Sequence, residues 1–193
     1  MFRRGRALFG GIYKGNHQKM GWVFVMIDKI NDIRKALLNK TYISAVALAL
    51  TLPDICSQVE NNTAESSKKN YIAWVNNHLP VDCFNFPLAG FEEQTFTGNM
   101  CYSLRCSVLH SGSTDVANQK LHVTVDRFLL TKPGDAKYNK GFMYSEEKQA
   151  DGTVLKTTYI GIDYLCECLC NAAEQFYNQW NDKSAFDDHV FAK

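Results

Sequence analysis

Arg105 and His110 are the two residues of this chain whose types and spacing suggest chemistry on a phosphate. A histidine exchanges protons near neutral pH, and a guanidinium group can bind two oxygens of one phosphoryl group. Residues five apart on an ideal α-helix are turned by about 140° from each other. His110 falls in the last turn of the predicted helix, however, where helices loosen and side chains can swing. We therefore expect both side chains to reach one phosphate.

The stretch that carries this pair, TGNMCYSLRCSVLHSG at residues 97–112, has the pattern of an amphipathic helix. Thr97 or Asn99 is suited to cap its start, and Gly112 is suited to end it in the left-handed conformation. The apolar residues recur at helical spacing, which predicts one face buried in a core. These residues are Met100, Cys101, Leu104, Val108 and Leu109.

The N-terminal half of the chain predicts further helices. Isoleucines and leucines mark one face of a helix over residues 26–38. A second helix, YISAVALALTL at 42–52, is capped by Thr41 and is apolar on all sides, which predicts deep burial. Pro53 ends that run and suits the first turn of a third helix over 53–60.

The C-terminal half combines two predicted strands with a long helix. LHVTVDRFLL at 121–130 alternates and is rich in β-branched residues, and VLKTTYIGI at 154–162 is expected to be its partner strand. Asp163 is expected to cap the final helix. The predicted fold class is therefore mainly α, an antiparallel helical bundle with a small β-hairpin at about 121–162 inserted before the last helix.

The domain organisation follows from these elements. Residues 1–25 hold five basic and no acidic residues and several glycines, which we interpret as a flexible basic N-terminal extension. Residues 26–182 form one helical domain that contains the hairpin, and residues 183–193 form a polar C-terminal tail that we expect to be frayed.

Charge and hydropathy exclude some classes of function. Lys and Arg number 21 against 20 Asp and Glu, so the chain lacks the basic coat of a nonspecific nucleic-acid binder, and any contact with RNA must be local. The longest apolar run, at 42–52, is about half as long as the roughly twenty residues that span a bilayer. We expect a soluble, cytoplasmic protein without a membrane partner.

Seven cysteines are an odd number, and several lie inside apolar helical patterns. We therefore expect a reducing compartment and no disulfides. Cys166, Cys168 and Cys170 form C-x-C-x-C, but residues two apart on a helix point to different faces. Core packing is thus favoured over metal binding, and neither a metal nor a cofactor is predicted.

The arginine and histidine pair, together with two longer phrases, resembles the HEPN superfamily (higher eukaryote and prokaryote nucleotide-binding). The signature of that superfamily is an arginine followed four to six residues later by a histidine in a late helix of a bundle. YISAVALALTLPDICSQVE at 42–60 and MCYSLRCSVLHSG at 100–112 resemble a group of uncharacterised bacterial proteins associated with it. The resemblance covers roughly residues 26–112 and the closing helix.

The resemblance implies a metal-independent endoribonuclease that acts as a homodimer, in a toxin or phage-defence role. His110 would move the proton of a ribose 2′-hydroxyl or of the leaving oxygen, and Arg105 would stabilise the phosphoryl charge. The partners implied are RNA and an antitoxin or other regulatory protein. Active relatives often place asparagine or aspartate directly after the arginine, where this chain has Cys106; Ser107 or Tyr102 could supply the hydrogen bond instead.

Other interpretations of the same residues stay open. His110 could only interact with a helix dipole, and Arg105 could only pair with Asp54 or a surface carboxylate. Asp54, in the first turn of its helix, could also orient Arg105 or His110 from behind. The chain could then be a catalytically inactive dimeric module that binds a nucleotide or a partner protein, or a purely structural dimer.

Overall fold

The structure of the chain is a computed structural model that describes residues 26–80, 83, 96–111, 126–138 and 141–189. The predicted extension at 1–25, the helix end at Gly112 and the first part of the strand predicted at 121–130 lie outside these residues. The described part is mainly helical, as the sequence predicts.

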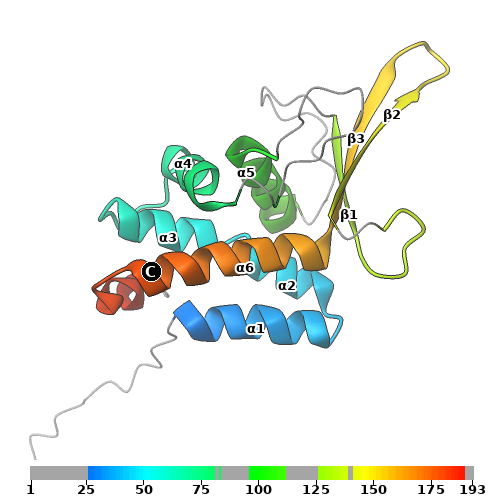
Figure 1. Cartoon of the computed structure of the whole chain (residues 1–193). Coiled ribbons are helices and arrows are strands. Elements are labelled where there is room, and N and C mark those ends of the chain that lie inside the picture. The colour runs from blue at the N-terminus through cyan, green and yellow to red at the C-terminus, as the bar shows by residue number, and fades with distance from the viewer. Residues whose placement is uncertain (1–25, 81–82, 84–95, 112–125, 139–140, 190–193) are drawn as a thin grey trace, which may run out of the picture.

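Helix α6 (Ile162–Gln179) crosses the middle of the helical body (Figure 1). Helix α1 (Met26–Leu38) lies beside it in the opposite direction and buries Met26, Ile30 and Ile33, which recur on one helical face. Arg34 links α1 to α6, because its guanidinium group donates hydrogen bonds to the side chains of Asn171 and Glu174 at 3.0 and 2.8 Å.

Two helices follow in the apolar stretch. Helix α2 (Tyr42–Ala49) ends before the predicted end at residue 52, and helix α3 (Leu52–Glu60) begins one residue before Pro53, which lies in its first turn as predicted. Every residue of α3 from Leu52 to Val59 is buried. The prediction of deep burial is wrong for α2, where Ile43 is 66% exposed, because α2 packs on α1 and α6 along one side only.

This stretch also bears on the membrane question. Within the described residues, Tyr42–Glu60 is the segment long and apolar enough to span a bilayer by length and composition. Two thirds of it, 67%, is buried inside the protein, as in the core helix of a folded domain.

Helix α4 (Lys68–His78) and helix α5 (Gly98–Cys106) complete the helical body. Ser67 caps α4 by accepting a hydrogen bond from the backbone N–H of Asn70. Tyr71, Trp74 and Val75 of α4 are buried. Helix α5 packs mainly on α4 (Figure 1).

The predicted β-hairpin is instead a three-stranded sheet of β1 (Arg127–Thr131), β2 (Phe142–Lys148) and β3 (Val154–Gly161), in the order β1-β3-β2. The two predicted strands do pair, but in parallel, with Phe128 opposite Thr158. The hairpin is formed by β2 and β3, with Phe142 opposite Ile160, and extends away from the helices (Figure 1).

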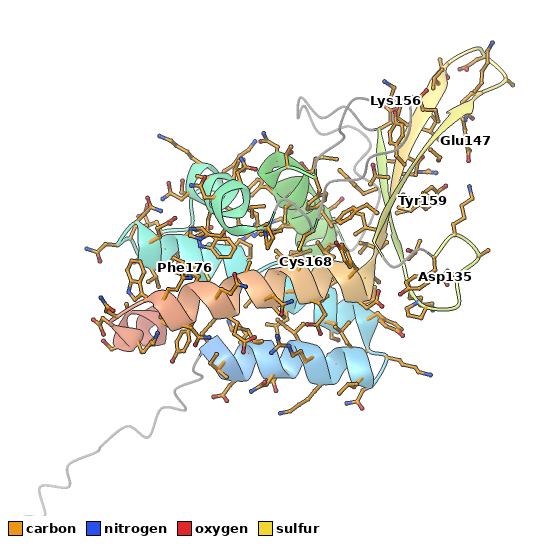
Figure 2. The ribbon with its side chains drawn as sticks, in the orientation of Figure 1. Asp135, Glu147, Lys156, Tyr159, Cys168 and Phe176 are labelled. Carbon is orange, nitrogen blue, oxygen red and sulfur yellow. The ribbon has the colours of Figure 1, made fainter. Side chains whose placement is uncertain are left out.

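The final helix differs in two details from the prediction. Gly161, not Asp163, is the N-cap of α6, and the Asp163 carboxylate accepts a hydrogen bond from the Tyr138 hydroxyl at 2.7 Å. The segment expected to be a frayed tail forms a 3-10 helix, Lys183–His189, because Phe186 is fully buried against the C-terminal part of α6. Figure 2 shows Phe176 in that part of α6 and Cys168 nearer its middle.

Candidate functional site

Helix α5 is held close to α4 at its first residue. Thr97 caps α5 as predicted, accepting a hydrogen bond from the backbone N–H of Met100. A Cβ atom on Gly98 would lie 2.4 Å from the carbonyl oxygen of Ile72, so only glycine fits this approach. The Gly98 backbone N–H also donates to the Asn76 side chain at 2.7 Å. These contacts fix the position of Arg105 two turns further along α5.

Arg105 reaches from α5 to α3 and forms an ion pair with Asp54. Its Nε atom donates to Asp54 Oδ2 at 2.6 Å, and the two side chains are 17% and 11% exposed. The second carboxylate oxygen of Asp54, Oδ1, accepts a hydrogen bond from the Ser66 hydroxyl at 2.6 Å. Asp54 therefore contacts the guanidinium group through one oxygen and one nitrogen, not as a two-point pair. Within the described residues, the terminal nitrogens of Arg105 form no hydrogen bond.

Two tyrosine rings enclose the guanidinium group. Its central carbon lies 5.8 Å from the ring centre of Tyr71 and 5.7 Å from that of Tyr102, within the range of cation–π attraction. The hydroxyl of Tyr71 donates to the Leu50 carbonyl oxygen, so the buried ring is fixed to the end of α2. The ammonium group of Lys68 lies 5.5 Å from the Tyr102 ring centre, so this ring contacts two cations.

Burial and pairing shape the pKa values here. Burial acts to lower the pKa of Arg105, but the charge of Asp54 and its hydrogen bond overcome this, and the pKa is raised. Burial likewise raises the pKa of the Cys101 thiol to about 12 and that of Tyr71 well above its ordinary value. Arg105 is therefore a permanent cation, with Asp54 as its counter-ion and the neutral groups of Tyr71 and Cys101 nearby.

His110 lies beyond the α-helix, on the π-turn Ser107–Ser111. A π-turn closes at i→i+5, so it advances less per residue than an α-turn and brings the fifth residue back closer to the face of the first. The angular separation of Arg105 and His110 is therefore smaller than the about 140° of an unbroken α-helix. His110 is exposed, and it makes no hydrogen bond or ion pair with other residues that the structure describes.

The π-turn also changes the predicted apolar stripe. Met100, Cys101 and Leu104 are buried as expected. Leu109 is 37% exposed, contrary to the prediction, because it follows the point at which the helical register changes.

The other predicted site residues lie around Arg105 in different ways. Tyr102 contacts the guanidinium group directly. Burial raises the pKa of Tyr102, and the neighbouring thiol of Cys106 raises it further. Ser107 is only 3% exposed and belongs to the packed interior.

Ser66, Lys68 and Tyr71 were missed by reasoning from the sequence. Ser66 lies in the stretch ENNTAESSKK, which reads as a solvated loop, and Tyr71 fits the apolar face of its helix. One signal was present: Asp54 lies within the mostly apolar run at 42–60, and a carboxylate needs a partner if that run is buried.

The C-x-C-x-C motif is packed in the core, as predicted. Cys166, Cys168 and Cys170 are all buried, and burial is the largest cause that raises the pKa of each. In the part of the chain that the structure describes, no group of three or more histidine, cysteine or acidic residues has the arrangement of a metal site.

Comparison with known proteins adds no assignment to this geometry. No protein-family model matches the chain, and neither does any curated protein or solved structure.

Proposed function

We propose that the chain is an endoribonuclease of the HEPN type, which cleaves RNA without a metal ion by attack of a ribose 2′-hydroxyl on the adjacent phosphate. The proposal starts from the sequence resemblance. In this proposal the chain is a cytoplasmic homodimer in which two copies of α5 face one RNA strand. Its role is that of a toxin or a phage-defence protein, controlled by a regulatory protein.

One observation carries the proposal. Asp54, itself held by Ser66, bonds Arg105 through Nε at 2.6 Å, and the terminal edge of the guanidinium group is uncommitted within the described residues. That edge presents two parallel N–H groups, the arrangement that binds two oxygens of one phosphate. A fixed cation stabilises charge that develops on a phosphoryl group at little reorganisation cost.

His110 would provide the proton transfer. As a base it would take the proton of the 2′-hydroxyl while the 2′-oxygen forms a bond to phosphorus, and the 5′-oxygen of the next nucleotide would leave and take a proton from water or from the protonated histidine. The products are a 2′,3′-cyclic phosphate and a 5′-hydroxyl, because the attacking group belongs to the substrate. The exposed position of His110 agrees with this role, since a structural histidine is usually held by partners.

The test is incubation of the purified chain with total RNA and transfer RNA in EDTA, followed by end-group analysis of the fragments. We expect cyclic phosphate ends with the wild-type chain and none with His110→Ala. His78→Gln is the matched control: His78 bonds Glu60 at 2.8 Å and stacks on Trp74, away from Arg105, and glutamine can keep the bond to Glu60. Equal cleavage by wild-type and His110→Ala would refute the assignment of His110.

A second candidate function has its own support. The Arg105 side chain is only 17% exposed and already has an anionic partner, and Cys106 stands where active relatives carry a hydrogen-bonding residue. These features suit a catalytically inactive module that binds a nucleotide or partner protein at the same helix. Light scattering of the purified chain and the RNA assay together separate the cases. A dimer that binds RNA without cutting it supports the module, and a monomer contradicts both composite-cleft proposals.

A further inference from the structure

A pocket of about 430 Å³ opens where the α1–α2 connection, the end of β1 and the start of α6 meet. Its volume falls in the range of about 300–1,000 Å³ that small-molecule sites occupy. Figure 2 shows Asp135, one of its lining residues, in the loop after β1 beside the start of α6. None of the residues that line it belongs to the Arg105 site. Other lining residues are Lys40, Ile43, Ser44, Leu130, Lys132 and Ile162.

The charges of the lining favour an anion. Lys40 and Lys132 are both exposed, and neither forms an ion pair within the described residues. The carboxylate of Asp135 also lines the pocket, but its Oδ2 accepts a hydrogen bond from the Lys132 backbone N–H at 3.0 Å and so holds the turn. The lining therefore holds two positive charges, from Lys40 and Lys132, and one negative charge, from Asp135, and its net charge is positive.

The remaining lining suits an organic group. Ile43 is 66% exposed, Leu130 is half-buried and Ile162 is buried, so the pocket has an apolar wall next to its charges. An exposed isoleucine of this size gains free energy if a ligand covers it. A volume of about 430 Å³ also exceeds what a lone phosphate group would need.

Lys40 occupies a backbone position that normally selects glycine or asparagine. The Lys40 N–H bonds the Leu37 carbonyl at 3.0 Å, and the Thr41 N–H bonds the Ala36 carbonyl at 2.9 Å, which is the Schellman pattern at the end of α1. Lys40 therefore has a left-handed φ of 58°. A lysine there is less favourable for the backbone than a glycine would be.

We propose that this pocket binds a small organic phosphate, with the phosphate group between the ammonium groups of Lys40 and Lys132 and the organic part against Ile43, Leu130 and Ile162. A phosphate monoester carries up to two negative charges at neutral pH, which matches two lysines. The proposal does not depend on the nuclease activity.

Isothermal titration calorimetry on the full chain tests it with three probes: phenyl phosphate, inorganic phosphate and phenol. We expect phenyl phosphate to bind with a dissociation constant below about 1 mM, inorganic phosphate more weakly, and phenol not at all. Lys40→Ala and Lys132→Ala should each weaken phenyl phosphate binding about tenfold, the effect of losing one charged hydrogen bond. Lys148→Ala, an exposed lysine on β2, is the matched control and should change nothing.

Lys40→Gly separates a ligand role from a structural one. Glycine relieves the left-handed strain, so the melting temperature should rise while phenyl phosphate affinity falls. Asn62 has the same position at the end of α3, with φ of 48°, and Asn62→Gly should change neither quantity appreciably. A Lys40→Gly variant that binds as tightly as wild-type would overturn the proposal.

Two further outcomes would also overturn it. Phenyl phosphate that fails to bind at about 10 mM excludes a site of useful affinity. Binding that persists in Lys40→Ala and Lys132→Ala but disappears in Arg105→Lys would place the phosphate at the Arg105 site and not in this pocket.

Discussion

Arg105 and the lysine pair Lys40 and Lys132 hold positive charge in contrasting surroundings. Arg105 is 17% exposed, bonds Asp54 at 2.6 Å and lies between two tyrosine rings. Lys40 and Lys132 are exposed beside an open pocket, without an anionic partner in the described part of the chain. The contrast follows from desolvation. A buried cation loses its hydration and needs a counter-ion in the protein, whereas an exposed cation is stabilised by water. One region is therefore fixed before any ligand arrives, and the other keeps its charge available.

The two regions are also joined through one stretch of chain. The first turn of α2 lines the pocket, and α3, which follows directly, carries Asp54. Because the residues that line the pocket and those that hold Arg105 do not overlap, a variant in one region can leave the other as an internal reference. Phenyl phosphate binding reports on the pocket, and the free energy of unfolding reports on the packing around Arg105 and on the backbone at Lys40.

Asp54→Ala should have the largest effect. It leaves the guanidinium group buried without a counter-ion and should lower the free energy of unfolding by about 3 kcal/mol, measured by urea denaturation. Asp32→Ala removes an exposed carboxylate that pairs with Lys35 at 3.4 Å, and should cost less than about 0.5 kcal/mol.

A double-mutant cycle sharpens this prediction. The double variant Asp54→Ala with Arg105→Ala should lose less than the sum of the two single variants, because neither charge is then left alone. Additive losses would show that the two side chains do not interact. Arg105 would then not be a cation fixed by a counter-ion, and the contrast with the lysine pair would not hold.

Gly98→Ala should have the next largest effect. The new Cβ would lie 2.4 Å from the Ile72 carbonyl oxygen, a backbone atom that cannot swing aside. We expect α5 to shift on α4 at a cost of about 2 kcal/mol, with phenyl phosphate binding unchanged. An unaltered melting temperature would mean that α5 and α4 are further apart than the structure has them.

Local pattern explains which parts of the fold were predictable. Helix α1 matches its predicted range because periodic isoleucines leave one possible face. Pro53 marks the start of α3 because a proline is tolerated in the first turn of a helix, where its missing N–H costs no hydrogen bond. The buried cysteines of α6 follow from the spacing of a helix apolar on most sides.

The sheet shows where local pattern fails. Strand β2 ends in Glu146, Glu147 and Lys148, so its sequence resembles a polar loop. Those side chains are exposed at the far end of the hairpin, where a strand needs no apolar face. The parallel pairing of β1 with β3 is a contact between segments remote in sequence, and no local periodicity encodes strand direction.

The Arg105 site was predictable in part for the same reason. The partnership of Arg105 with Asp54 was one of the alternatives that the sequence left open, since a charge in an apolar run needs a partner. Ser66 could not be found in that way, because its role depends on a loop returning over α3. The π-turn under His110 has no sequence signature among the residues of the motif.

Tyr71→Phe should have a smaller effect on the Arg105 region. It removes the hydroxyl that donates to the Leu50 carbonyl at 3.2 Å and keeps the ring that contacts Arg105. We expect a loss of about 1 kcal/mol in urea denaturation. A loss as large as that of Asp54→Ala would mean that the hydroxyl, and not the carboxylate, holds the guanidinium group in place.

Lys40→Gly should have the smallest effect on stability, and the opposite sign. A left-handed non-glycine residue costs about 1–2 kcal/mol, but glycine adds flexibility to the unfolded chain, so the net gain should be about 0.5 kcal/mol. Asn62→Gly should gain only a few tenths of a kcal/mol, because asparagine tolerates this conformation. A variant that is more stable and yet binds phenyl phosphate less well would show that the exposed lysine is retained at a cost in stability. Arg105 gives the reverse case, in which removing the cation should lower stability, so the two regions would differ in the sign of the effect as well as in its size.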